Sequence, residues 1–260
     1  MGKLLKRHQN KKLYSASKLP PKNFKWPAKS EYSFFDSYPR NHVLDYTEKT
    51  LKNLDLEKID LLQFHTWDDS WSEIDEWKRS IDDLKNSGKI TAIGISMNRW
   101  EPENGIKALK TGLIDSVQVI YNIFDQAPED KLFPICKELD IGIIARVPFD
   151  EGTLTGNINL NTVFPKDDWR STYFVPENLK SSVNKVDKIR PLIPVKKTMA
   201  EVALRFILMN KEVSTIIPGM RKKKNVISNI STSDGKGIDH ILFEELKKHR
   251  WDRKPTSWSQ

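Results

Sequence analysis

Short apolar or β-branched runs alternate along the chain with longer stretches of helical period. This alternation is typical of βα units, and a series of such units predicts a parallel sheet. We expect strands at Lys12–Ser17, Ile59–Phe64, Ala92–Ser96, Ser116–Tyr121, Gly142–Arg146 and Ser214–Pro218. The helical period predicts helices at Val43–Leu54, Ser72–Asn86, Glu101–Lys110, Glu129–Leu139, Asn178–Arg190, Thr198–Asn210 and Lys222–Ile230. Thr198 and Glu201 have the spacing of a capping box, which favours a helix start there.

Two stretches, Leu19–Asn41 and Gly152–Glu177, are too long for simple connections. Both follow the carboxyl end of a predicted strand, where the active-site loops of α/β barrels gather. We therefore assign both to a catalytic rim. The alternative is a plain surface insertion, because insertions also concentrate in loops.

The composition allows a globular core and excludes a collagen-like chain, a disordered tail and an integral membrane protein. Of 260 residues, 38% are hydrophobic and 30% charged, and no apolar run approaches the length of a membrane span. Cys136 is the only cysteine, which favours a reducing cytoplasm over a disulfide-linked secreted scaffold. The start, Met1–Arg7, is basic and lacks the apolar core of a signal peptide, and it reads as the last turns of a helix.

Charge adds one further question. Lysine and arginine exceed aspartate and glutamate by 43 to 35, a formal charge of +8. The excess fits a polyanion, a compact phosphate ligand or a solvated surface, and part of it lies in the run Arg221–Lys224. Being modest, it leads us to expect no nucleic-acid partner.

Polar residues stand where three predicted strands end: Lys18, His65 and Ser96. In a parallel barrel such positions converge on one cavity. Taken singly, His65 could be a structural histidine and Lys18 a surface lysine, so the coincidence of strand ends carries the prediction.

Five motifs in order carry a family resemblance. They are Lys58–His65, Gly88–Ser96, Val117–Asn122, Gly152–Gly156 and Ile217–Gly219. The series resembles the aldo-keto reductase family over nearly the whole chain. The resemblance implies a single domain over residues 1–260 with a (β/α)8 TIM-barrel fold, and reduction of a small-molecule aldehyde or ketone by hydride transfer from NADPH without a metal.

The resemblance also implies roles for individual residues. Lys18 would be the lysine that lowers the pKa of a catalytic tyrosine, and His65 the histidine that orients the substrate carbonyl. An ammonium group favours the tyrosinate and so makes the phenol a better acid.

Cofactor contacts follow in the same way. Ser96 and Gln118 would bind the nicotinamide carboxamide; the family's next position is Met97 here, with Asn98 one residue later. Arg146 falls at the ring-stacking position, where its planar guanidinium could lie on the nicotinamide. Ser96 could otherwise cap a strand end, and Gln118 could be a buried ladder amide.

The segment from Pro218 to Asn229 resembles the family's adenosine-phosphate site. Gly219, Arg221, Asn225 and Asn229 are the candidate contacts. Four successive cations at a helix start oppose the helix dipole, and a bound phosphate would remove that conflict, which favours NADPH over NADH. No glycine-rich dinucleotide motif follows a strand, and the histidines show no metal-ligand spacing.

The family's catalytic tyrosine and aspartate precede the lysine strand, but only 17 residues precede Lys18. Two βα units need roughly 30 residues each, so we expect the first two to be lacking. Tyr14 lies four residues before Lys18, about 13 Å along a strand, and cannot substitute.

Two interpretations of the short start remain open. One is a fragment of a complete reductase, and the other is a catalytically inactive nucleotide-binding or interaction protein. A barrel without two strands exposes two edges, which would favour self-association.

Overall fold

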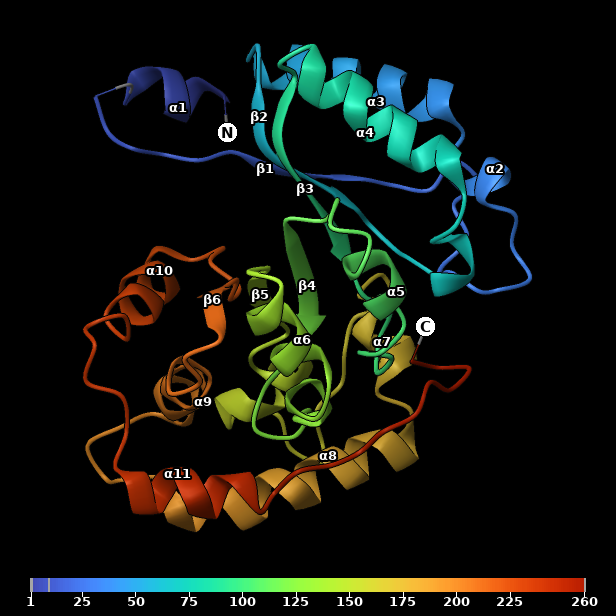
Figure 1. The fold of residues 1–260 in the computed structure, drawn as a ribbon. Coiled ribbons are helices and arrows are strands. Elements are labelled where there is room, and N and C mark those ends of the chain that lie inside the picture. Colours follow the sequence, from blue (N-terminus) through green and yellow to red (C-terminus); the bar gives the residue numbers. More distant parts are fainter. Residues whose placement is uncertain (1, 9, 260) are drawn as a thin grey trace. The chain divides into compact units, whose positions relative to one another are not determined.

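A computed structural model describes residues 2–8 and 10–259. Within this part of the chain the strands follow chain order in one six-stranded sheet, and the assigned strand pairs are parallel (Figure 1). The strands are β1 Ala16–Leu19, β2 Ile59–Phe64, β3 Ile90–Ser96, β4 Ser116–Ile120, β5 Gly142–Arg146 and β6 Val213–Ile216. This confirms the parallel α/β prediction.

Helices connect the strands. They are α1 Gly2–Arg7, α2 Phe34–Ser37, α3 Arg40–Leu54, α4 Asp75–Asn86, α5 Ile106–Leu109, α6 Leu132–Glu138, α7 Arg170–Tyr173, α8 Pro176–Ile189, α9 Met199–Leu208, α10 Lys223–Ile230 and α11 His240–Lys247. In the described residues, none is both long and apolar enough to cross a bilayer.

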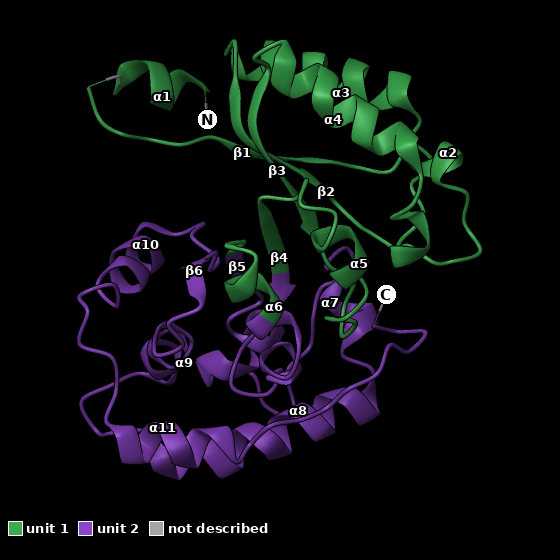
Figure 2. Ribbon diagram, in the orientation of Figure 1, with its two compact units in different colours: residues 1–118, 135–142 green, residues 119–134, 143–260 purple. Residues whose placement is uncertain are grey.

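The chain divides into two compact units, coloured separately in Figure 2. Unit 1 comprises residues 1–118 and 135–142, and unit 2 comprises residues 119–134 and 143–260. The assignment of one domain to the whole chain stays a prediction.

In unit 1, α3 and α4 pack side by side and contact β1 and β3 (Figure 1). Leu19, Phe64, Ile95 and Val117 occupy one register row of β1–β4 and are fully buried. Trp67, Trp71 and Trp77 extend this core through edge-to-face ring contacts. Because side chains alternate along a strand, the other face is left for the polar residues.

Unit 2 has its own core around α9, whose N-cap Thr198 accepts a hydrogen bond from the Glu201 N–H at 3.1 Å, as the capping-box spacing predicts. Val202, Phe206 and Ile207 of this helix are fully buried. The Phe206 ring also packs against Phe243 of α11 at 5.1 Å.

Several predicted bounds shift by one to three residues, and two predicted elements differ from the structure by more. The strand expected at Lys12–Ser17 begins at Ala16 and runs to Leu19, because Asp60 accepts hydrogen bonds from the Ser15 N–H and hydroxyl and fixes the register there. The helix expected at Glu101–Lys110 is reduced to Ile106–Leu109. Its first turn is replaced by a loop whose Asn104 side chain bonds Asp68 and the Asp69 N–H.

Candidate active site and nucleotide groove

One face of the unit 1 strands is polar. Lys18 pairs in register with Gln63, Gln63 with Gly94, and Gly94 with Ser116, so these four positions face the same side. One step nearer the carboxyl ends, Ser96 pairs with Gln118, and His65 directly follows β2. The predicted residues Lys18, His65, Ser96 and Gln118 are therefore brought to one face and one end of these strands.

Lys18 lies within β1 rather than after it, which corrects the expected strand end. It and His65 are half-buried, whereas Ser96 and Gln118 are 3% exposed each. The His65 N–H donates to the Leu19 carbonyl at 3.0 Å, which holds the ends of β1 and β2 together.

The register row of Lys18, Gln63, Gly94 and Ser116 contains two polar atoms whose hydrogen-bonding capacity is unused within the described residues. The Gln63 Nε2 and Ser116 Oγ atoms are buried and have no hydrogen-bond partner among the described residues. Between them stands Gly94, where a Cβ would collide with Ser116 Oγ. Glycine thus allows the two polar side chains to approach each other across β3.

The loop after β1 reaches His65. The indole of Trp26 meets the His65 ring edge-on, with centroids 4.5 Å apart. Two residues on, the Ala28 N–H donates to both Thr66 Oγ1 and Asn98 Oδ1, at 2.8 and 3.2 Å, and the Ala28 carbonyl accepts from Asn98 Nδ2 at 2.9 Å.

Asn98 is fully engaged by protein groups. Besides Ala28, its Oδ1 accepts from Thr66 Oγ1 at 2.6 Å and its Nδ2 donates to Glu101 Oε2 at 2.8 Å. Both amide hydrogens and both acceptor sites are therefore used. A contact between Asn98 and a nicotinamide stays a prediction. In the structure Asn98 anchors the backbone of Ala28, a role that sequence reasoning missed.

Met97, where the motif departs from the family pattern, packs on the opposite face. A Cβ at Gly105 would lie 2.6 Å from the Met97 sulfur and 2.9 Å from Ile95 Cδ1, so the thioether fills the space beside α5. Met97 is 1% exposed.

Unit 2 contains a groove of about 710 Å³ beside the carboxyl ends of β5 and β6. Three segments line it: the turn after β5, the loop before α7 and the turn after β6. The lining residues are Val147, Pro148, Phe149, Glu151, Gly152, Pro165, Asp167, Asp168, Trp169, Arg170, Ile217, Gly219 and Arg221. Gly219 and Arg221 were both predicted from the sequence.

The groove carries two arginines. Arg170 grips Asp168 with Nε and Nη2, at 3.0 and 2.6 Å from the two carboxylate oxygens. The Arg170 hydrogen bonds lower the pKa of Asp168 to about 2, and the charge of Arg221 contributes. Arg170 is thus paired with Asp168. Arg221 is exposed, and its charge helps to lower the pKa of Asp168.

The α10 helix begins directly after these residues. Its N-cap, Lys222, makes no side-chain capping bond, and Lys223 and Lys224 form the first turn. Asn225 is half-buried, and Asn229 is 8% exposed and donates to the Gly219 carbonyl at 3.2 Å. A helix start without a side-chain cap would suit an anion.

Arg146 is the last residue of β5, and its carbonyl accepts from the Tyr121 N–H at 3.3 Å. The structure puts it in unit 2, directly before the groove-lining turn. Its stacking on a nicotinamide stays a prediction.

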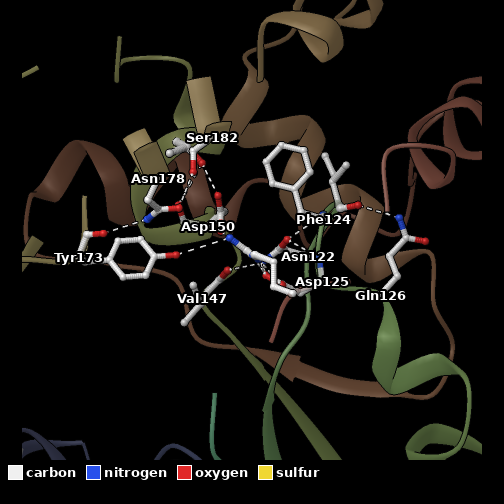
Figure 3. Close-up of polar contacts among 12 residues, drawn as sticks. Asn122, Phe124, Asp125, Gln126, Val147, Asp150, Tyr173, Asn178 and Ser182 are labelled. Atoms are coloured by element: carbon white, nitrogen blue, oxygen red, sulfur yellow. Dashed lines mark hydrogen bonds and ion pairs between the residues drawn. The ribbon is translucent and has the colours of Figure 1, made fainter. Parts of the chain in front are cut away.

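The polar cluster in Figure 3 was not predicted. Asn122 donates to Asp125 at 2.8 Å and to the Val147 carbonyl at 3.0 Å, joining the turns after β4 and β5. Asp150 and Tyr173 belong to the same region. Arg253 from the C-terminal segment contacts Asp125, Asp150 and Tyr173.

A parallel α/β sheet with polar side chains at the carboxyl ends of its strands is typical of the active sites of α/β-barrel enzymes. The sequence model of the aldo/keto reductase family matches residues 1–248. The chain belongs to this family.

Curated relatives agree. A probable aldo-keto reductase of Glycine max is 31% identical over 73% of this chain and 54% of its own length. The NADH-specific methylglyoxal reductase of Escherichia coli is 28% identical over 70% of this chain and 56% of its own length. The chain thus spans little more than half of these relatives.

Solved structures share the fold. A glycerol dehydrogenase of Gluconobacter oxydans has a TM-score of 0.75 at 26% identity, over 95% of this chain and 75% of its own. The holo form of an aldo-keto reductase from Bacillus halodurans has a TM-score of 0.74 at 21% identity, over 100% of this chain and 80% of its own.

Proposed function

We propose that the protein reduces an aldehyde or ketone carbonyl with NADPH. The observation that carries the proposal is the shared polar face of unit 1, where Lys18, Ser96 and Gln118 converge near His65 at the strand ends. Family membership supports oxidoreductase chemistry on carbonyls.

In this proposal each residue has one task. His65 donates a hydrogen bond to the substrate carbonyl oxygen and orients it. The Lys18 ammonium lowers the pKa of the tyrosine that this family uses as proton donor. Ser96 and Gln118 hold the carboxamide, and the bound nicotinamide supplies a hydride.

The groove in unit 2 supports the choice of NADPH. Its volume is in the range of ligand sites, and its exposed Arg221 stands beside the uncapped start of α10. A guanidinium can grip the additional phosphate that distinguishes NADPH from NADH. The Escherichia coli relative is named NADH-specific, so the choice between the two cofactors has to be tested for this chain.

The experiment is a steady-state assay of NADPH oxidation with a panel of aldehydes and ketones. We expect turnover when the chain is extended upstream to include the two βα units that carry this family's tyrosine and aspartate. In that protein we expect Lys18→Met to lower kcat by about 10²–10⁴-fold, the usual contribution of general acid catalysis. Lys22→Met, on the loop after β1, is the control. Equal rates for the Lys18 variant and the wild type would refute the assignment.

A second candidate is nucleotide binding without turnover. In unit 1, the Tyr38 hydroxyl donates to the Thr66 carbonyl and accepts the Thr66 N–H, and burial raises its pKa. Tyr14 precedes β1 and is 65% exposed. Neither of these two phenols is arranged as a proton donor to a substrate. Tight NADPH binding by calorimetry without NADPH oxidation would favour this candidate.

Two further properties remain proposals. The first is a cytoplasmic location, with which a single cysteine agrees. Self-association would use the outer edges of β1 and β6, the first and last strands of the sheet, and sedimentation at increasing concentration tests it.

A further inference from the structure

Arg253 is a buried arginine far from the predicted site residues in sequence. Its side chain is 4% exposed, and the carboxylates of Asp125 and Asp150 are 6% and 2% exposed. Arg253 Nε donates to Asp125 Oδ1 at 3.1 Å, and Nη2 donates to Asp150 Oδ1 at 2.7 Å. Nη2 also pairs with Asp125 Oδ2.

The two carboxylates lie on different turns. Asp125 follows β4, in the turn that Asn122 closes (Figure 3). Asp150 follows β5, and both neighbours of Asp150, Phe149 and Glu151, line the groove. The Asp150 carboxylate itself is buried and bonds Arg253 and Thr153 Oγ1, so the arginine holds the groove wall from its inner side.

The groove wall has an unfavourable backbone. Val147, Asp150 and Glu151 have φ of 55°, 46° and 55°, and Gly152 follows with φ of 114°. Left-handed backbone is disfavoured for residues with a Cβ, most of all for β-branched valine. Such a run persists only where surrounding contacts over-determine it.

One contact that stabilises this backbone is the ion pair between Arg253 and Asp150. Burial alone would lower the pKa of Arg253, but the attraction of Asp125 and Asp150 outweighs it and raises the pKa, so the guanidinium stays charged. The Arg253 Cζ atom lies 4.6 Å from the centroid of the Trp251 ring. The backbone N–H of Trp251 donates to the Phe124 carbonyl at 2.8 Å. The C-terminal segment thus delivers Arg253 in a fixed position.

We propose that Arg253 is a positioning residue that holds the segment Val147–Gly152, with its four positive-φ residues, in its groove-lining conformation and thereby sets nucleotide affinity. The effect on affinity rests on the proposed NADPH function. The effect on the segment does not.

The chain offers a matched control. Arg250 also joins the C-terminal segment to the connection after β4, through Nη1 to Asp130 Oδ1 at 2.7 Å, but this pair is exposed and does not include Asp150. Arg250→Gln therefore removes a comparable tether without touching the groove wall. Asp150→Asn and Asp130→Asn form the matching pair on the carboxylate side.

The first readout is hydrogen exchange of the free protein at the amides of Asp150, Gly152 and Leu154, which donate within the turn. Arg253→Lys keeps the charge but loses the planar fork, and Asp150→Asn leaves Arg253 paired with Asp125, so both variants should fold. We expect faster exchange at these amides in both variants, and wild-type exchange in Arg250→Gln and Asp130→Asn.

The second readout is the NADPH Kd by calorimetry. If the segment keeps its groove-lining form about a tenth of the time, the apparent Kd rises about 10-fold. Unchanged exchange in Arg253→Lys and Asp150→Asn, or equal changes in the controls, would overturn the proposal. A wild type that does not bind NADPH would refute the proposed function, and the exchange data would still decide the role of Arg253.

Discussion

The Trp26 indole lies edge-on to the His65 ring, with the two centroids 4.5 Å apart. Trp26 is 41% exposed, so one part of it covers the histidine and another faces solvent. An aromatic wall beside the proposed carbonyl-orienting residue would favour apolar substituents on the substrate.

Replacing Trp26 by alanine tests that wall. Aromatic pairs contribute about 0.5–1.5 kcal/mol, so the KM for an aromatic aldehyde should rise roughly 2- to 10-fold. Because Trp26 is partly exposed, the melting temperature should change little. Phe24→Ala, on the same loop and 73% exposed, is the control. A KM that is unaltered in Trp26→Ala would exclude the ring from substrate binding.

Asn98→Ala should change substrate binding through the loop after β1, which contains Trp26 and Ala28. It removes hydrogen bonds to Ala28, Thr66 and Glu101 and leaves buried groups unsatisfied, at about 1–3 kcal/mol of unfolding free energy. We expect a higher carbonyl KM with an unchanged NADPH Kd, because Trp26 is two residues from Ala28. A weaker NADPH Kd with an unchanged carbonyl KM would instead support the cofactor contact predicted from the sequence.

Arg221→Ala should discriminate between the two nicotinamide cofactors. A hydrogen bond to a charged group contributes about 1.5–3 kcal/mol, so the NADPH Kd should rise roughly 10- to 100-fold while the NADH Kd stays nearly constant. Lys224→Ala, exposed on the first turn of α10, is the control. Equal losses for both cofactors would mean that Arg221 does not read the additional phosphate.

Cys136 gives a prediction about pH. Its side chain is buried, and burial raises the pKa of the thiol from 9.0 to about 12. Between these values the unfolded chain ionises while the folded chain does not, so the unfolding free energy should fall as pH rises through this window. Native protein should resist iodoacetamide at pH 9 and react once unfolded in urea. Rapid alkylation of the native protein would contradict the burial.

Some elements were predictable because their signals are local. β2 and β5 have the expected bounds, since each is an apolar run bounded by polar residues or glycine. The start of α9 follows from Thr198 and Glu201. α11 was missed although Asp239 caps it, accepting from the Ile241 N–H at 2.9 Å; that aspartate was the available signal.

The remaining features depend on distant contacts. β1 starts at Ala16 because of Asp60, 45 residues from Ser15. Asn98 binds the backbone of Ala28, 70 residues away, and Arg253 binds Asp125 and Asp150, 128 and 103 residues away. No local pattern reports such pairs, so sequence reasoning found the polar strand ends and missed the residues that hold their loops.

The most direct test of the proposed function is isotope transfer. The protein, extended upstream by the two βα units that carry the family's tyrosine and aspartate, is incubated with an aldehyde and with NADPH that carries deuterium at the transferable position of the nicotinamide. The alcohol is examined by mass spectrometry. We predict one deuterium on the former carbonyl carbon, with far less labelled alcohol for Lys18→Met. Tightly bound NADPH without any labelled alcohol would contradict the reductase assignment and support nucleotide binding alone.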